Sequence, residues 1–347
     1  CLIVGKSTVP VGTTAAVREL ARAVAPAGTG VDVAWNPEFL REGSAVQDAL
    51  RPDRIVVGVA SAGAEARIRA AYQPITDVSV PLVVTDPATC ELMKGAANAF
   101  LATKISFINA MAGICEAAGG DIGQLAHAVG LDPRIGQACL GPGIGYGGGC
   151  LPKDTRAFAA MARRLGGDLA AGLLDAVDAI NAGRRQRVAE LAVKASGGDP
   201  RGRRVGLWGA AFKPGTDDVR DSPALAVGAR LHRLGALVTV YDPLARANAQ
   251  AAHPELDYVP DALSAATAAD MLVVATGWDE FRAIDPGAAA RLANGQVVID
   301  AVRVLPAGEW QAAGWAVQVL GDGAAAGSSR APEAADRYPD PVACRES

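Results

Sequence analysis

The chain has 347 residues, half of them hydrophobic, and a formal net charge of −4, which is enough material for two or three domains with sizeable cores. Lysine and arginine are scattered and no apolar run reaches the ~18 residues of a membrane span, so neither nucleic acid nor a membrane is an expected partner. The six cysteines form no CxxC pair, which argues against a metal site and structural disulfides and favours a reducing, cytoplasmic location.

The first part of the chain alternates short apolar strands with amphipathic helices. Strands are predicted over residues 1–4, 31–35, 55–59 and 81–85, with helices over 13–25 and 64–72. This succession of strand, helix and strand is typical of a parallel sheet. The chain begins within the first strand, from which we expect that the natural N-terminal segment lies before residue 1.

The middle of the chain is predicted to be helical. From Pro87 onward the apolar residues keep a helical spacing, with much alanine and no further proline, until a Gly-Gly pair at 119–120. Asp121 is then a suitable N-cap for a shorter helix, and further helices are predicted over 155–165 and 169–191. Because the apolar positions of the long helix cover more than one face, we expect it to form the core of a homodimer, with Ile108 and Met111 in the contact.

A Gly-Gly-Asp-Pro linker at 197–200 precedes a second series of strands and helices. Its strands are predicted over residues 204–208, 237–241, 271–275, 297–299 and 316–320. Residues 324–347 are rich in Ala, Ser, Pro and charge and have no periodicity, so we expect disorder there.

A cysteine in a glycine-rich loop is the strongest functional signal. Residues 147–154 read Gly-Gly-Gly-Cys-Leu-Pro-Lys-Asp; the glycines allow close approach of a ligand, and Lys153 with a helix start at Asp154-Thr155 favours the thiolate of Cys150. We interpret Cys150 as a nucleophile, the alternative being a small apolar packing residue. Residues 143–148 match GxGxxG, but we reject a dinucleotide fingerprint because no strand precedes the match and no helix follows it directly.

Two earlier segments carry candidate charged groups. Lys94 and Asn98 are spaced i and i+4 in the long helix, so they share one face, and Lys94 either serves a site or extends to the rim. Glu38 and Glu42 follow the strand at 31–35, where open α/β sheets bind ligands, and they share a face if the segment is helical. The alternative for these two is a solvated helix start.

Residues 7–14 and 212–223 also follow predicted strands. The first segment begins a helix and offers hydroxyl and N–H groups to an anion, although ordinary capping is the simpler interpretation. The second presents Lys213 and Arg220, two cations suited to a phosphate, against the alternative of a solvated loop. We expect both cations at the mouth of the second sheet, facing Cys150.

Together these segments resemble the UDP-glucose/GDP-mannose dehydrogenase family, the nucleotide-sugar 6-dehydrogenases. The resemblance covers residues 1 to about 321 and is carried by five ordered motifs: STVPVGTT, NPEFLREGSAVQD, ELMKGAANAFLATKISFINA, GPGIGYGGGCLPKD and FKPGTDDVRDSPA. FLREG and GIGYGGGCLPKD are most similar to the bacterial UDP-glucose branch. The resemblance implies that roughly a hundred N-terminal residues, including the NAD fingerprint, are absent.

The resemblance also implies a fold of two Rossmann-like parallel-sheet domains, the first incomplete, joined by a long central helix and a helical domain. The implied boundaries are a remnant of the NAD-binding domain at 1–86, a central dimerisation and catalytic-cysteine domain at 87–196, a UDP-sugar-binding domain at 201–322 and a disordered tail at 323–347.

Members of this family oxidise the C6 alcohol of a nucleotide sugar to a carboxylate with two NAD, as in UDP-glucose to UDP-glucuronate. The resemblance implies that Cys150 attacks the intermediate aldehyde, that a second hydride transfer gives a thioester and that water hydrolyses it. It further implies that Lys94 and Asn98 stabilise oxyanions, that Glu38 serves as acid and base, and that Thr8 and Asp154 place water.

The same resemblance implies the binding residues. NAD would be held by Thr8, Glu42, Lys153 and Arg220. The sugar nucleotide would be held by Phe39, Leu40, Arg41, Glu42, Lys94, Cys139, Leu140, Gly141, Pro142, Gly143, Gly147 and Lys213. The alternatives are a GDP-mannose or UDP-N-acetyl-hexosamine 6-dehydrogenase, and an inactive fragment that only binds the sugar nucleotide or dimerises.

Overall fold

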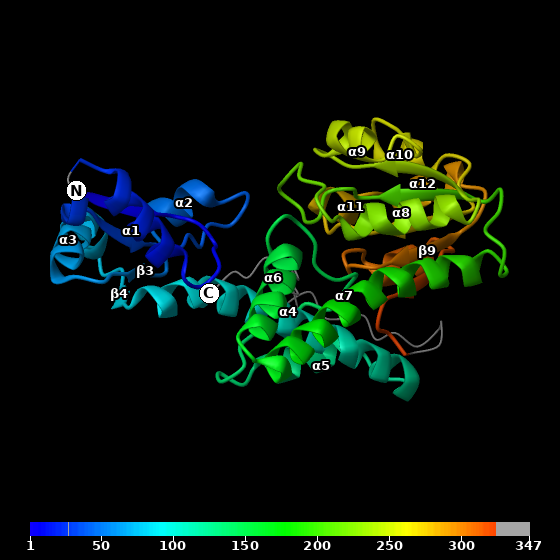
Figure 1. Ribbon diagram of the computed structural model, residues 1–347. Helices are drawn as coiled ribbons and strands as arrows, with labels where there is room; N and C mark the ends of the chain where they lie inside the picture. Colours follow the sequence, from blue (N-terminus) through cyan, green and yellow to red (C-terminus); the bar gives the residue numbers. More distant parts are fainter. Residues whose placement is uncertain (27, 324–347) are drawn as a thin grey trace. The chain divides into compact units, whose positions relative to one another are not determined.

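The computed structural model describes residues 1–26 and 28–323, so the tail predicted to be disordered lies outside the described residues. The chain forms two compact units (Figure 1). Unit 1 comprises residues 1–100 and 157–171, and unit 2 comprises residues 101–156 and the described chain from 172 onward.

Unit 1 is built on a four-stranded sheet with the order β1-β2-β3-β4. Its elements up to the long helix are β1 (Leu2–Gly5), α1 (Thr13–Val24), the short 3₁₀ helix η1 (Gly28–Gly30), β2 (Asp32–Trp35), α2 (Ala45–Leu50), β3 (Ile55–Gly58), α3 (Ala62–Thr76) and β4 (Leu82–Thr85). All four predicted strands and both predicted helices are confirmed.

The expectation of an all-parallel first sheet is wrong at one pair. β1 pairs with β2 and β3 with β4 in parallel, whereas Trp35 of β2 pairs with Gly58 of β3 in the antiparallel sense. The connection between β2 and β3 covers residues 36–54 and contains the short helix α2, and it joins the two strands in opposite directions. The chain therefore turns at one edge and returns in the opposite direction.

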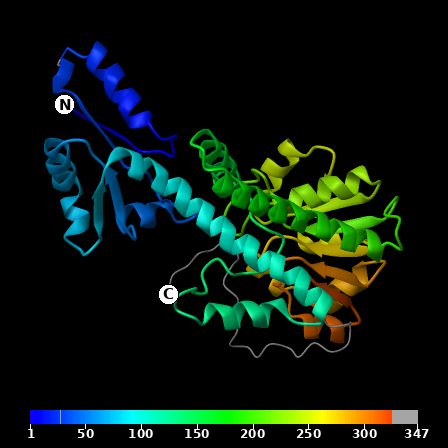
Figure 2. The same cartoon turned by 60° about the horizontal axis from the view of Figure 1, so that its bottom comes forward.

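Four helices follow β4, and the first is the longest in the described chain. They are α4 (Pro87–Ala118), α5 (Ile122–Gly130), α6 (Leu151–Arg164) and α7 (Asp168–Ala195). Figure 2 shows α4 as one unbroken helix (cyan), as predicted. The Asp121 carboxylate accepts the N–H of Gln124 at 2.8 Å, which confirms its capping role for α5.

One face of α4 packs within unit 2 against α5. Ile108 is fully buried there with Ala112 and Ile122, and Met111 packs against the same cluster. The predicted dimer contact is therefore wrong for Ile108, which is buried in the core of its own chain. Met111 is half-buried beside it, and its part in a dimer stays a prediction. The exposed large apolar residues of this part of α4 are Phe107 and Ile114.

The expectation that no segment could span a membrane needs correction for α4. By length and composition this helix is sufficient, with a mean hydropathy of 1.2 in its most apolar window. Half of that window is buried inside the protein.

Unit 2 contains a six-stranded parallel sheet with the order β10-β9-β8-β5-β6-β7. This is the strand order 3-2-1-4-5-6 of a dinucleotide-binding fold, read from its other edge. Its elements are β5 (Arg204–Trp208), α8 (Pro223–Arg233), β6 (Leu237–Tyr241), α9 (Arg246–Ala252), β7 (Asp257–Tyr258), α10 (Ala262–Ala266), β8 (Met271–Val274), α11 (Asp279–Arg282), α12 (Pro286–Leu292), β9 (Val297–Asp300), α13 (Ala307–Ala312) and β10 (Ala316–Val319).

Successive residues of the second sheet enter two different cores. Leu207 packs with α7 and α8 on one face, while its neighbour Trp208 packs with α10 and α13 on the other. Since strand side chains alternate between faces, the nearly continuous apolar strands are those of a sheet covered on both sides. The predicted fold class is confirmed, with five of the six strands of this sheet predicted from the sequence.

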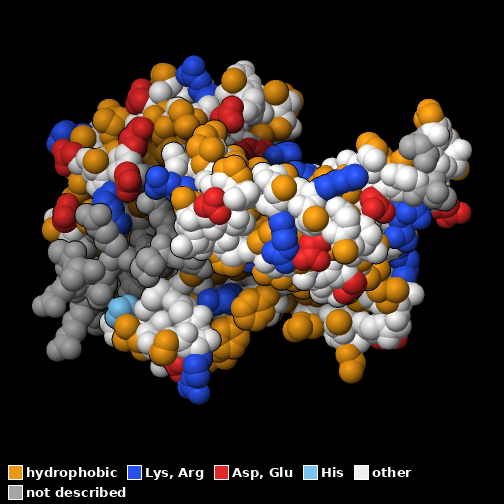
Figure 3. All heavy atoms as spheres, turned by 90° about the vertical axis from the view of Figure 1, so that its left-hand side faces the viewer, with side chains coloured by type: hydrophobic (Ala, Val, Ile, Leu, Met, Phe, Trp, Pro, Cys, Tyr) orange, Lys and Arg blue, Asp and Glu red, His pale blue; other side chains and the backbone are white. Residues whose placement is uncertain are grey.

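Charged groups of both signs share the face of the molecule drawn in Figure 3. Lys and Arg side chains are interspersed there with Asp and Glu, in line with the near balance of 33 basic and 37 acidic residues. This face presents no continuous stripe of one sign.

Candidate active site

The Cys150 thiol is exposed and lies at the start of α6. The Cys150 carbonyl accepts the N–H of Asp154 at 2.8 Å, and the helix begins at Leu151, so the predicted start at Asp154-Thr155 is wrong. Proline suits the first turn of a helix, which explains why Pro152 lies inside it. The thiol therefore lies at the N-terminal end of α6, where the first N–H groups of the helix are found.

Two other free thiols of the described chain, those of Cys90 and Cys115, are buried. Burial raises the pKa of Cys90 to about 12 and also raises the pKa of Cys115. Cys150 is therefore the accessible thiol that combines exposure with a glycine-rich loop.

Arg220 lies directly beside this loop. Its guanidinium packs against Gly149 so closely that a Cβ at that position would be 2.5 Å from Arg220 Cζ. Arg220 also pairs with Asp218 at 2.7 Å, its carbonyl accepts the N–H of Gly148 at 2.9 Å, and its side chain is 68% exposed. The glycine at 149 is what allows a cation to approach the backbone next to Cys150.

Three further predicted residues of unit 2 lie around the same loop. Asp154 is buried, and Lys153 pairs with it at 3.1 Å while its own side chain stays 66% exposed. Lys213 is half-buried with Nζ 5.8 Å from the centre of the Phe212 ring, and that ring packs against Gly148. Unit 2 thus brings Lys153, Asp154, Lys213 and Arg220 to the Cys150 loop.

The predicted substrate-binding stretch 139–143 and Gly147 are buried. Its Gly143 peptide is held on both sides, because the N–H donates to Asn109 Oδ1 at 2.9 Å and the carbonyl accepts from Arg184 Nε at 3.1 Å. Burial lowers the pKa of Arg184 to about 10. Any ligand contact from this stretch would therefore come through groups that are already firmly placed.

In unit 1, Lys94 is buried and paired. It is 6% exposed, its Nζ lies 3.9 Å from Glu38 Oε1, and the same Nζ is 5.1 Å from the centre of the Phe39 ring. This excludes the alternative of a lysine extending to the rim. Asn98 lies one turn further along α4 and is equally buried. Unit 1 brings Lys94, Glu38 and Phe39 together.

The segment carrying Glu38 and Glu42 is a loop. The next helix, α2, begins only at Ala45, so these two carboxylates do not share a helix face. Glu38 Oε2 instead accepts the N–H of Leu40 at 2.8 Å. Arg41 forms an ion pair with Asp48 of the same loop, with Nη2 2.6 Å from Oδ1. This contact lowers the pKa of the Asp48 carboxyl.

The N–H groups of segment 7–14, which the sequence offered to an anion, already bind a carboxylate of the same chain. The N–H groups of Gly12 and Thr14 donate to the two carboxylate oxygens of Glu91 at 2.7 and 2.5 Å. Glu91 belongs to α4 and is 4% exposed, so it caps α1 from a distant part of the sequence. Thr8 lies half-buried in the same loop.

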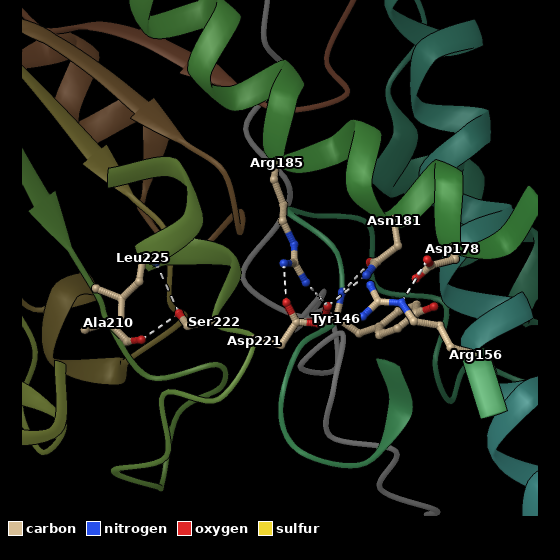
Figure 4. A network of polar contacts seen from close by, with 9 residues as sticks. All are labelled: Tyr146, Arg156, Asp178, Asn181, Arg185, Ala210, Asp221, Ser222 and Leu225. Atoms are coloured by element: carbon tan, nitrogen blue, oxygen red, sulfur yellow. Dashed lines mark hydrogen bonds and ion pairs between the residues drawn. The ribbon is translucent and has the colours of Figure 1, made fainter. Parts of the chain in front are cut away.

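Sequence reasoning missed the residues of α7 that hold the cysteine loop. Figure 4 shows Asn181 and Arg185 directed at the Tyr146 peptide, with Arg185 also contacting Asp221. Arg156 pairs with Asp178 beside them at 3.0 Å. One signal was present, since Asn181 and Arg185 are spaced i and i+4 and share a helix face.

Three family models match this chain in sequence order. All belong to the UDP-glucose/GDP-mannose dehydrogenase family: the NAD binding domain over residues 1–76, the central domain over 88–183 and the UDP binding domain over 206–307.

Similar whole proteins carry related names. The chain is 46% identical over 286 residues to a UDP-glucose 6-dehydrogenase of Rhizobium meliloti strain 1021, covering 82% of this chain and 65% of that protein. It is 39% identical to UDP-glucose 6-dehydrogenase TuaD of Bacillus subtilis strain 168, covering 97% of this chain and 71% of the relative. A UDP-glucose dehydrogenase structure from Pyrobaculum islandicum is 40% identical with a TM-score of 0.80, covering 89% of this chain and 68% of that one.

The chain thus spans about two thirds of the length of these relatives. Within that length the order of domains and the Rossmann-type second sheet agree with the matches. The chain belongs to the UDP-glucose/GDP-mannose dehydrogenase family.

Proposed function

We propose that the chain carries the chemistry of an NAD-dependent UDP-glucose 6-dehydrogenase, which converts UDP-glucose to UDP-glucuronate. The observation that carries the proposal is an exposed thiol, Cys150, at the start of α6 with the guanidinium of Arg220 packed on the preceding glycine. The similarity to UDP-glucose 6-dehydrogenases at 39–46% identity supports the same reaction.

The proposed role of Cys150 is to retain the aldehyde formed by the first oxidation. The thiolate adds to the aldehyde carbon, and the oxygen takes up a proton to give a thiohemiacetal. Oxidation of that carbon gives a thioester, and water cleaves it, releasing the carboxylate and the thiol. Asp154, buried at the first turn of α6, and Thr8 are proposed to place the water.

Unit 1 is proposed to supply the charges that this chemistry needs. Lys94 is buried, so its ammonium would act on an oxyanion with little screening by water. Asn98 would donate a second hydrogen bond to the same charge. Glu38, 3.9 Å from Lys94, is proposed as the acid and base for thioester formation and hydrolysis.

NAD, when bound, would accept the hydride at each of the two oxidations. Arg220 and Lys153 fit an anionic cofactor, because both side chains are about two thirds exposed beside the Cys150 loop. Thr8 and Glu42 are the proposed cofactor residues of unit 1. The NAD-binding family model over residues 1–76 supports this assignment.

The sugar nucleotide is proposed to contact Lys213 and the two loops already described. The unit 2 sheet supports a nucleotide site at the strand ends, where its order reverses between β5 and β8. The proposed substrate residues are Phe39, Leu40, Arg41, Glu42, Lys94, Cys139, Leu140, Gly141, Pro142, Gly143, Gly147 and Lys213.

The choice of sugar rests on the relatives. UDP-glucose is favoured over an N-acetylated sugar because the matching N-acetylgalactosaminuronic acid dehydrogenase structure from Methanosarcina mazei is 25% identical, against 40% for the UDP-glucose enzyme of Pyrobaculum. A turnover assay with UDP-glucose, GDP-mannose and UDP-N-acetyl-hexosamines, alongside an NAD titration of the chain, tests the proposal. Binding of a sugar nucleotide without NAD binding or acid formation would support the inactive alternative.

We also propose a cytoplasmic homodimer formed through the exposed face of α4. Phe107 and Ile114 are 50% and 61% exposed and lie seven residues apart, so they share a helix face. Phe107→Glu should therefore lower the mass measured by light scattering to that of a monomer, whereas Lys194→Glu on α7 should leave the mass unchanged. An unchanged mass for folded Phe107→Glu would contradict the proposed interface.

A further inference from the structure

The Tyr146 peptide group is held from two directions by α7. Its N–H donates to Asn181 Oδ1 at 2.8 Å, and its carbonyl accepts from Asn181 Nδ2 at 3.0 Å and from Arg185 Nη2 at 2.9 Å. Tyr146 precedes Cys150 by four residues in the glycine-rich loop, and its side chain is fully buried. The loop that carries the thiol is therefore anchored by a single helix face through the two peptide units on either side of Tyr146.

The same guanidinium extends to the loop that carries Arg220. Arg185 Nη1 lies 2.7 Å from Asp221 Oδ1, with side chains 16% and 31% exposed. Figure 4 shows Arg185 pointing from α7 between Tyr146 and Asp221. Such a partly sheltered, charge-assisted contact is stronger than an exposed ion pair.

Asp221 is itself tightly placed between the two loops. Its φ of 47° lies in the left-handed region, which aspartate tolerates better than most residues. Its carbonyl lies so close to Gly147 that a Cβ there would collide with it. The next residue, Ser222, caps α8 by accepting the N–H of Leu225 and donates to the Ala210 carbonyl at 2.6 Å. A shift of Asp221 would therefore move both loops.

We propose that Arg185 is a positioning residue that couples the nucleophile loop to the loop of Lys213 and Arg220. One nitrogen of its fork fixes Tyr146, and thereby Cys150 at the start of α6, and the other fixes Asp221 beside Arg220. A lysine carries the same charge but lacks the fork, so it could not hold both partners. The assignment of the two loops to catalysis rests on the proposed function, whereas the mechanical coupling does not.

The test measures the rate at which iodoacetamide alkylates Cys150, followed by peptide mass spectrometry. Arg185→Ala should slow alkylation about fivefold, because the loop then no longer holds the thiol in its place at the start of α6. Asp221→Asn should slow it in the same direction, and the double variant should be no slower than Arg185→Ala alone. Arg187→Ala is the matched control, since Arg187 lies on the same helix and pairs with Glu116 instead.

Arg185→Lys separates positioning from general stabilisation. It should restore the thermal stability lost in Arg185→Ala but not the alkylation rate. Where the chain turns over UDP-glucose, Arg185→Ala should lower kcat about tenfold with KM within about twofold, as expected when only the reactive geometry is lost.

An alkylation rate within about 1.5-fold of the wild type in folded Arg185→Ala and Asp221→Asn would overturn the coupling. Recovery of the rate in Arg185→Lys would overturn the need for the fork. A wild-type chain without turnover, but with alkylation that depends on Arg185 as described, would reject the proposed function and leave the coupling intact.

Discussion

The two sheets differ in how the turn after their first strand binds a carboxylate. In unit 1 the N–H groups at the start of α1 bind the Glu91 carboxylate, which comes from α4. In unit 2 the N–H groups of Ala210 and Ala211, just after β5, bind Asp242 from the end of β6 at 2.7 and 2.9 Å. Each of these turns thus binds a carboxylate from another part of its own unit.

The two turns differ in which groups remain available to bind a ligand. In unit 1 the carboxylate caps the helix itself, so the turn becomes a structural anchor. In unit 2 the carboxylate closes only the turn, and the chain continues to Ser222 before α8 begins. That longer loop presents Lys213 and Arg220 to the cysteine loop. We therefore expect an anion at this loop to be bound by side chains and not by backbone N–H groups.

The largest expected effect tests whether the thiol in the cysteine loop of unit 2 takes part in the reaction. Cys150→Ser should reduce formation of the uronic acid roughly a thousandfold or more, because the hydroxyl is a much poorer nucleophile at neutral pH. Acid product would be measured by mass spectrometry with UDP-glucose and NAD, using a longer version of the chain if this one does not bind NAD. Cys115→Ser, at a buried thiol, is the control. Normal turnover by Cys150→Ser would reject the thioester mechanism.

The next effect separates the two cations of the unit 2 loop. Lys213→Ala should weaken sugar-nucleotide binding more than NAD binding, and Arg220→Ala the reverse, by about 1.5–3 kcal/mol or ten- to a hundredfold. Calorimetry with each ligand measures the difference.

Arg201→Ala is the matched control for Arg220. Arg201 forms the same kind of contact with Asp199 two residues before it, at 2.7 Å, but away from the cysteine loop. Equal losses for Lys213→Ala and Arg220→Ala, or losses no larger than for Arg201→Ala, would remove the assignment of these two residues.

A smaller effect concerns the anchor in unit 1. Glu91→Ala should cost about 2 kcal/mol of local stability, because it leaves the N–H groups of Gly12 and Thr14 without their acceptor. Hydrogen exchange in α1 should accelerate about thirtyfold. Glu65→Ala, which removes an exposed ion pair with Arg69, should have little effect. If the amides of α1 kept their protection in Glu91→Ala, the claim that the first turn is a structural anchor would be rejected.

The smallest effect is a pH dependence of the loop before α2. The pKa of Asp48 is lowered chiefly by its hydrogen bond to Arg41, so its stabilising contribution is complete above the unfolded pKa near 3.9 and is lost as pH falls through the lower folded value. Asp48→Asn should therefore cost about 1 kcal/mol at pH 7 and progressively less below pH 4. Urea unfolding at several pH values measures this, and a pH-independent difference would contradict it.

Much of the architecture was predictable from the sequence because it depends on local patterns. Apolar runs bounded by turn residues predicted both strand series, and an alanine-rich helical spacing predicted α4. Asp121 was recognisable as a cap from its place after a glycine pair. The glycine run before Cys150 signalled a close approach, and the approaching group is Arg220.

Only the tertiary structure decided how distant residues meet. Nothing local in the sequence shows that Glu91 caps α1, that β2 and β3 run antiparallel, or that Ile108 faces its own chain. The same holds for Arg185, whose fork joins Tyr146 to Asp221. Chain pattern sets which residues are buried and helical, because periodicity is a property of neighbours. Pairing between charges depends on which surfaces pack together, and that is settled only when the whole chain has folded.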